Sequence, residues 1–277
     1  MEVRFSTDPE SFKGMNSQVL RGNFLMEGLF APDTIPMVYA ELDRSITGSA
    51  VPATRALHLE SSRREMAADY FAERREIGII NIGAEGTVLV DGKEYVLEVR
   101  DGLYIGRGAK EVVFSSRAQD APAKFYFVSY PAHREYPAQH IRLADAAPLR
   151  LGSAREANQR TIHKYIHPGA FPTCQLVMGL TQLETGSVWN TWPPHTHQRR
   201  SEVYMYFALD ENAAVVHLMG RPEETRHLIV RNQQAVIAPS WSIHSGVGTQ
   251  SYTFIWAMGG ENQVFDDMDG ISVPSVS

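Results

Sequence analysis

Two histidines and a glutamate stand close together in the second half of the chain, in the stretch HTHQRRSEVY at positions 195–204. Side chains of an extended segment alternate in direction, so His195 and His197 point the same way. The step from His197 to Glu202 is odd, so a turn or bulge among the polar residues 198–201 must intervene if all three side chains are to converge. Imidazole and carboxylate groups gathered in this way would bind a metal ion.

A fourth candidate ligand, His244, ends the stretch PSWSIH, in which Pro239 closes an expected strand. Three neutral imidazoles and one carboxylate suit zinc, ferrous iron, manganese, nickel or copper. A position left free for water or substrate would make the metal catalytic, whereas a closed site would be structural. A lone His-x-His pair is usually part of a polar loop, but the glutamate and the distant histidine favour a metal site.

Composition and charge exclude several classes of protein. The chain has 277 residues, of which 43% are hydrophobic, enough for one large domain or two ordinary ones. Its formal charge is −6, and it contains no run of five basic residues, so we expect no nucleic-acid or membrane partner. Cys174 is the single cysteine and no stretch approaches 18 apolar residues, so we expect a soluble cytoplasmic protein.

Strand patterns rich in Val, Ile, Tyr and Phe recur at intervals of roughly ten residues. In GTVLVDGKEYVLEV, Asp91-Gly92 separates two β-prone runs, which predicts a hairpin with a type I′ turn. Helical signals are few: a helix start at 7–10 and patchy helical spacing at 17–26. The pattern predicts an all-β fold, a sandwich or closed barrel. Further strands are expected at 124–130, 174–184, 201–209, 213–220, 227–230, 234–239 and 252–258.

A faint internal repeat divides the chain. The stretch ERREIGIINIG (73–83) is similar to QRRSEVYMYFAL (198–209), and each leads into a strand pattern. A stretch rich in Pro, Ala and charged residues (131–160) lies between them. Two gapped matches could arise by chance, but they predict two related β units, residues 1–135 without a metal motif and residues 136–277 with the metal site.

The candidate ligands resemble a known motif. His195-x-His197-x4-Glu202, followed by Pro239-x4-His244, resembles the two halves of the cupin metal motif, although Trp241 stands where glycine is typical. The first unit has no histidines at the matching positions and is similar to a cupin unit without metal. The resemblance implies a bicupin-like fold, with two β-sandwich or jelly-roll barrel units, few short helices and one active site.

Longer blocks carry a narrower resemblance. LRGNFL, ERREIGIINIG, PSWSIHSGVGT and GENQVFDDMD are similar to the 5-keto-4-deoxyuronate isomerase family, and the likeness runs from about residue 20 to 270. It implies an aldose–ketose isomerase, an intramolecular oxidoreductase that interconverts 5-dehydro-4-deoxy-D-glucuronate and 3-deoxy-D-glycero-2,5-hexodiulosonate in pectin and polyuronate catabolism. It also implies a homo-oligomer, typically a hexamer, and one zinc ion per subunit, with other divalent metals as alternatives. The implied zinc ligands are His195, His197, Glu202 and His244.

Such an isomerisation needs groups that move protons. Glu202 is the nearest carboxylate in sequence, but metal ligation would reduce its basicity. Glu261, Asp266 and Asp267 are alternative bases, although their stretch could equally be a solvated tail. Tyr204 is a candidate proton donor to the enediolate.

The implied substrate is anionic and needs a local cation. Arg199 and Arg200 adjoin the candidate ligands, and a guanidinium can hold a carboxylate through two parallel hydrogen bonds. Only one of the two can easily face the pocket if the segment is extended.

Three other functions stay open at this stage. A ferrous cupin dioxygenase could use the same ligands with a redox-active metal and oxygen. Another cupin sugar isomerase, acting on deoxy-glucuronate derivatives, would differ only in pocket details. A cupin binding module or sugar sensor would bind without turnover.

Overall fold

The structure is a computed structural model, and it describes residues 1–264 and 266–277. The chain forms two compact units, each assembled from separate segments. The first unit comprises Met1–Arg4, Gly28–Ala146 and Tyr165–Val177, and the second Phe5–Glu27, Ala147–Lys164 and Met178–Ser277. The sequence predicts two consecutive units that meet between residues 135 and 136. Because each compact unit combines segments from different parts of the chain, this boundary stays a prediction.

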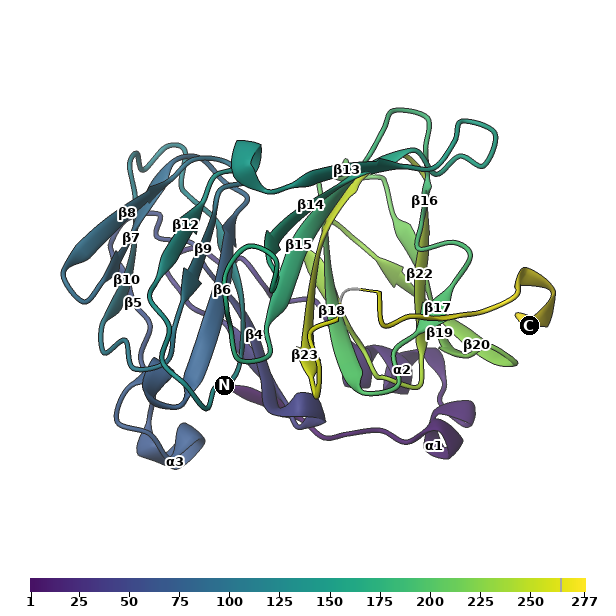
Figure 1. Ribbon diagram of the computed structural model, residues 1–277, viewed down its shortest axis with the longest axis horizontal. Coiled ribbons are helices and arrows are strands. Elements are labelled where there is room, and N and C mark those ends of the chain that lie inside the picture. The colour runs from purple at the N-terminus through teal and green to yellow at the C-terminus, as the bar shows by residue number, and fades with distance from the viewer. Residues whose placement is uncertain (265) are drawn as a thin grey trace. The chain divides into compact units, whose positions relative to one another are not determined.

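The first unit contains a seven-stranded and a four-stranded sheet, both drawn in Figure 1. The large sheet has the order β1 (Glu2–Arg4), β3 (Met37–Ala40), β4 (Ser45–Ala50), β11 (Phe125–Pro131), β6 (Arg75–Asn81), β9 (Gly102–Ile105), β12 (Gln139–Ile141). The small sheet has the order β5 (Leu57–His58), β10 (Val112–Ser116), β7 (Gly86–Val90), β8 (Lys93–Leu97). Asp91 and Gly92 join β7 to β8 with φ of 46° and 81°, which confirms the predicted hairpin turn.

The second unit repeats this arrangement. Its seven-stranded sheet has the order β13 (Pro148–Leu151), β14 (Arg160–Ile166), β15 (Val177–Leu183), β23 (Thr253–Gly260), β18 (Arg200–Phe207), β21 (Gln234–Ala238), β2 (Leu25–Met26). Its four-stranded sheet has the order β16 (Trp189–Asn190), β22 (Ile243–Gly248), β19 (Val215–Arg221), β20 (Glu224–Val230). A further pair consists of β17 (His195–Thr196) and β24 (Asp269–Gly270). The all-β fold of two sandwich-like units is thereby confirmed.

Helices in the described residues are short. They are α1 (Pro9–Lys13), α2 (Ser17–Phe24), α3 (Arg63–Met66) and the 3-10 turns Leu42–Arg44, Phe71–Glu73, Leu143–Asp145 and Val273–Ser275. The helix start predicted at 7–10 is present, because the Asp8 carboxylate caps α1 by accepting hydrogen bonds from two backbone N–H groups. None of the helices described at residues 1–264 and 266–277 combines the length and apolar character needed to cross a membrane.

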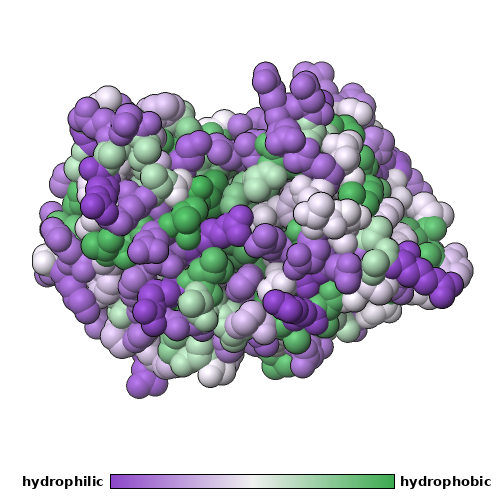
Figure 2. Space-filling view, turned by 90° about the horizontal axis from the view of Figure 1, so that it is seen from above, coloured by the Kyte–Doolittle hydropathy of each residue, from purple (hydrophilic) through white to green (hydrophobic). Residues whose placement is uncertain are grey.

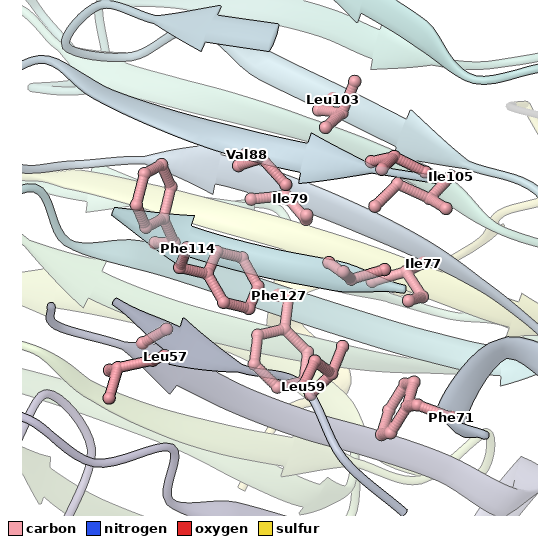
Figure 3. Close-up of a cluster of buried hydrophobic side chains, with 14 of the residues drawn as sticks. Leu57, Leu59, Phe71, Ile77, Ile79, Val88, Leu103, Ile105, Phe114 and Phe127 are labelled. Atoms are coloured by element: carbon pink, nitrogen blue, oxygen red, sulfur yellow. The ribbon is translucent and has the colours of Figure 1, made fainter. Parts of the chain in front are cut away.

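A dense apolar core fills the first unit between its two sheets. Figure 3 shows Ile77 and Ile79 of β6 among aromatic and aliphatic side chains from the neighbouring strands. Ile77 follows the first residue of β6 by two positions, as Glu202 follows the first residue of β18. Hydrocarbon therefore occupies the position in the first unit at which the second unit places a carboxylate.

The surface shown in Figure 2 is mostly hydrophilic, with smaller apolar groups between the polar residues. The large apolar side chains that are exposed include Val96 and Val99 in the first unit and Leu149 and Leu151 in the second. Scattered apolar side chains of this kind are normal on protein surfaces.

Candidate metal centre

The second unit brings the four predicted ligands together from three strands. His195 lies on β17, Glu202 on β18 and His244 on β22, and His197 directly follows β17. A turn at residues 198–199 precedes β18. This turn provides the change of direction that the odd spacing between His197 and Glu202 requires.

The ligand atoms surround a common point. The Nε2 atom of His195 lies 3.1 Å from Nε2 of His197 and 3.1 Å from Nε2 of His244. The Glu202 Oε2 atom lies 3.0 Å from Nε2 of His244 and 3.6 Å from Nε2 of His197. Ligands about 2.1 Å from one zinc-sized ion are separated by about 3.0–3.4 Å at neighbouring positions. The four residues could therefore hold a metal ion, and all four ligand atoms lie within 4.8 Å of one another.

The Glu202 carboxylate supplies an independent test of whether a cation fits. Glu202 is buried, and within residues 1–264 and 266–277 its Oε2 atom accepts no hydrogen bond. An uncompensated buried carboxylate costs on the order of several kcal/mol. A divalent cation between Glu202 and the three imidazoles would remove this cost, so the donor set fits such an ion.

Backbone carbonyl groups orient two of the imidazoles. The Nδ1 atom of His197 contacts the carbonyl oxygen of Asp267, and Nδ1 of His244 lies 3.3 Å from the carbonyl oxygen of Ser242. Because a carbonyl oxygen only accepts, an Nδ1 atom that bonds it carries a hydrogen, and Nε2 is directed toward the other candidate ligands. This is how metal-binding histidines are commonly held.

The protonation states also suit a cation. Burial lowers the pKa of His195 to about 3, so its imidazole is neutral near pH 7. Burial raises the pKa of Glu202, but the nearby His244 and His197 outweigh this effect, and the net pKa is lowered. A neutral His195 beside the Glu202 carboxylate leaves negative charge at the site for a metal ion to neutralise.

The ligands open into a cavity of about 250 Å³. His195, His197 and Glu202 form part of its wall, and most of the remaining wall is apolar. The other lining residues are Leu151, Arg160, Ile162, Thr181, Thr191, Trp192, Pro193, Tyr204, Phe254, Trp256, Met258 and Met268. A site open to such a cavity could bring a bound metal and a small molecule together.

Tyr204, the predicted proton donor, lines this cavity. Its hydroxyl lies 3.1 Å from Oγ1 of Thr191. Burial, followed by the charge of Glu202, raises the pKa of Tyr204 well above its ordinary value. The phenol therefore keeps its proton and can donate a hydrogen bond into the cavity.

The predicted substrate-binding arginines have other contacts. The Arg199 side chain is 70% exposed and lies 3.7 Å from the carboxylate of Glu261, which is 74% exposed. The Arg200 side chain is fully buried, its Nε lies 3.5 Å from Oδ2 of Asp267, and it also donates to the Asp267 carbonyl oxygen. Neither arginine lines the cavity, and nor does Glu261. Their proposed roles stay predictions.

The other two alternative bases also lie outside the cavity lining. Asp266 is exposed. The Asp267 carboxylate accepts a hydrogen bond from Asn262 in addition to its ion pair with Arg200. The neighbouring Phe265, part of the same sequence block, lies outside the described residues.

The sequence analysis missed one charged residue of the cavity wall, Arg160. Arg160 begins β14, and Ile162, two positions later on the same face of the strand, also lines the cavity. The alternation of side chains along residues 160–166 indicates that Arg160 and Ile162 share a face of the strand. The sequence does not indicate that this face turns toward the cavity beside β18.

Similarity to known proteins supports both the fold and the chemistry. The model of the KduI/IolB family matches residues 27–271. A 4-deoxy-L-threo-5-hexosulose-uronate ketol-isomerase from Caldicellulosiruptor bescii is 55% identical over 271 residues, covering 98% of each chain. Solved structures are more distant. An IolB-like protein from Salmonella typhimurium has a TM-score of 0.72 and 13% identity, over 90% of this chain and 97% of that one.

The oxalate decarboxylase of Bacillus subtilis, studied for its Mn(II) centres, has a TM-score of 0.53 and 12% identity. The match covers 79% of this chain and 69% of that one. At this identity the likeness concerns the fold, and it confirms the bicupin-like architecture.

Replacing His244 with alanine tests the ligand set. We expect the His244→Ala variant to lose its bound divalent metal, because the imidazole is a proposed ligand. Its far-ultraviolet circular dichroism should stay unchanged, because the backbone pairing of β22 does not depend on this side chain. Metal content per chain, measured by mass spectrometry after purification, gives the result. His227→Ala, at an exposed histidine on β20, is the control and should keep its metal. Full metal content in the His244 variant would contradict the assignment.

Replacing Arg200 with lysine tests the support of His197. Arg200 donates to the same Asp267 carbonyl that orients the His197 ring, so Arg200→Lys should weaken metal affinity by roughly 10- to 100-fold. Competition with a metallochromic chelator measures this affinity. Arg199→Lys changes the exposed neighbour and should leave the affinity unaltered. Equal affinities in both variants would mean that the buried guanidinium does not support the site.

Proposed function

Because the chain belongs to the KduI/IolB family, we propose that it is a ketol-isomerase acting on 4-deoxy-L-threo-5-hexosulose-uronate. The product would be 3-deoxy-D-glycero-2,5-hexodiulosonate, formed in the breakdown of pectin and other polyuronates. The observation that carries the proposal is the convergence of three histidines and a buried glutamate, of which His195, His197 and Glu202 line a cavity. Such an arrangement could hold a sugar carbonyl beside a cation that polarises it.

The reaction moves one proton from the hydroxyl-bearing carbon to the neighbouring aldehyde carbon, and one hydrogen between their two oxygen atoms. Negative charge builds on the aldehyde oxygen as the first proton leaves. A divalent cation bound at the site would act as a Lewis acid and stabilise this charge.

We propose zinc as the cation, one per subunit, held by His195, His197, Glu202 and His244. Zinc accepts nitrogen and oxygen ligands in this number and has no redox chemistry, which suits an isomerisation without net electron transfer. Another divalent ion with the same ligand preference would support the same reaction. A dioxygenase would instead require a redox-active metal and oxygen.

Two residues of the cavity wall are proposed to move protons. Tyr204, held by Thr191, would donate to an oxygen of the enediolate. Glu202 faces the same cavity and could shuttle the proton between the two carbons, although its ligand role weakens it as a base. Glu261 would have to leave its ion pair with Arg199 to take part, and its predicted catalytic role stays a prediction.

The remaining expectations concern assembly and location. We propose a homo-oligomer, with a hexamer as the state implied by the family resemblance. Light scattering on the purified protein would measure the assembly. A cytoplasmic location stays a prediction.

An anaerobic assay in deuterated water tests the proposed reaction. We expect conversion of the hexosulose-uronate to the ketose without oxygen, with deuterium entering the former aldehyde carbon whenever the transferred proton exchanges with solvent. Removal of bound metal by a chelator should abolish turnover, and added zinc should restore it. Turnover by the metal-free protein would contradict the proposal, and dependence on oxygen would favour the dioxygenase.

Replacing Tyr204 with phenylalanine tests the proton donor. We expect kcat to fall by roughly 10²- to 10⁴-fold, because the hydroxyl acts on the reacting oxygen, while metal content is retained. Tyr206→Phe is a matched control, since Tyr206 lies on the same face of β18 but its hydroxyl contacts His217 at 2.7 Å. If the two variants have the same kcat, Tyr204 is not the donor.

A further inference from the structure

The proposed substrate has a carboxylate that the metal ligands do not bind. The substrate is a uronate, so it carries a carboxylate at the end of the carbon chain opposite the aldehyde. The protein has a net charge of −6, which repels an anion weakly. Recognition of the carboxylate therefore requires a cation placed close to the cavity and away from the metal ligands.

Among the described residues, Arg160 is the one arginine or lysine that lines the cavity. Arg199 points into solvent beside Glu261, and Arg200 is buried against Asp267. These two cations already have carboxylate partners. Within residues 1–264 and 266–277, Arg160 forms no ion pair with a carboxylate, so its charge is available to a ligand.

One hydrogen bond orients the Arg160 guanidinium, and other N–H groups of this side chain can still bind a ligand. Its Nη1 donates to the backbone carbonyl oxygen of Asn158 at 2.8 Å, which fixes the orientation of the planar group. A guanidinium has five N–H donors, so several remain for a ligand. Burial lowers the pKa of Arg160, with smaller opposing effects from Tyr204, Tyr252 and Glu156, but the group stays charged near pH 7.

The surroundings of Arg160 strengthen a bond to an anion. Ile162 and the buried Trp256 share the cavity wall with it, so a carboxylate bound there would be partly shielded from water. Hydrogen bonds between an arginine and a carboxylate are stronger when both are partly desolvated.

Arg160 also lies between the cavity and a more polar surface depression. Arg160 and Leu151 line both, and the depression is completed by Arg150, Gly152, Gln159 and Glu184. The metal ligands line only the first cavity. The guanidinium thus stands on the side of the cavity that adjoins this depression, which suits a ligand with two polar ends.

We infer that Arg160 binds the carboxylate of the substrate and so directs the aldehyde end toward the metal ligands. This inference rests on the proposed isomerase function and adds the residue that selects a sugar acid over a neutral sugar. The residue is a specificity determinant that touches the substrate away from the reacting carbons. Its loss should therefore raise KM more than it lowers kcat.

The test compares the free acid with its methyl ester, which keeps the reacting carbons but lacks the negative charge. We expect Arg160→Gln to lower kcat/KM for the acid by roughly 10- to 100-fold, mostly through KM. The ester should be a poor substrate for the natural protein and should react equally well with the variant. Metal content should stay at the natural level, because Arg160 is not a ligand.

Three further variants isolate the charge. Arg160→Lys keeps a cation without the planar fork and should recover part of the affinity for the acid. Arg150→Gln removes an exposed arginine from the adjoining depression and should leave both substrates unaffected. Arg199→Gln tests the rival arginine, and loss of the preference for the acid in this variant alone would overturn the inference.

The outcomes separate this inference from the proposed function. If the natural protein converts neither acid nor ester, the proposed function fails. If it converts the acid and Arg160→Gln retains the full preference for acid over ester, the inference fails while the function stands. Should Arg160→Gln not fold, Arg160→Lys decides, because an unchanged KM in this variant would exclude a carboxylate held by the guanidinium fork.

Discussion

The buried Glu202 carboxylate is the constraint on which the site in the second unit depends, because its Oε2 atom accepts no hydrogen bond from the residues that the structure describes. The Glu202 carboxylate lies close to the Nε2 atoms of His197 and His244, and His195 completes the group of four candidate ligands, whose uncompensated carboxylate a cation would neutralise. The nearby architecture keeps these donors in place. The turn before β18 reverses the alternation of side chains, and backbone carbonyls hold the rings of His197 and His244. The folded chain thereby holds four side chains in an arrangement that could bind a metal ion.

The two units differ in what fills the space between their sheets: apolar side chains in the first and, in part, a cavity in the second. They share one strand order, and their central strands β6 and β18 occupy equivalent places in it. In the first unit Ile77 joins an interior of hydrocarbon, which stabilises by burial alone. In the second unit Glu202 stands at the equivalent position, and part of the interior is a cavity whose mostly apolar wall includes His195, His197 and Glu202. The exchange of Ile77 for Glu202, together with the three histidines that the first unit lacks, distinguishes the packed interior of the first unit from the candidate metal site of the second.

Local pattern was enough to predict the ligands but not their surroundings. Strand alternation, the odd step to Glu202 and the Pro-x4-His stretch all depend on residues close together in the sequence, and all four side chains converge.

The cations of the site are harder to predict. Arg199 and Arg200 adjoin the ligands in the sequence, but Arg199 lies in the turn and Arg200 begins β18, so their side chains lie in different environments. Arg160 reaches the cavity through the order β14, β15, β23, β18, which hydrophobic pattern does not encode. The same limitation hides the place of residues 5–27, since Leu25 pairs with Val236 across more than two hundred residues.

The histidine-bearing strand β17 has a partner that arrives late in synthesis. Its residue His195 pairs with Gly270 of β24, and the carbonyl that holds His197 comes from a residue 70 positions further along the chain. A growing polypeptide on the ribosome would expose both histidines well before that partner emerges. The candidate metal site is therefore completed only when the C-terminal segment has been made, and a nascent chain stalled before residue 267 would carry the four candidate ligands without the carbonyl group that holds His197.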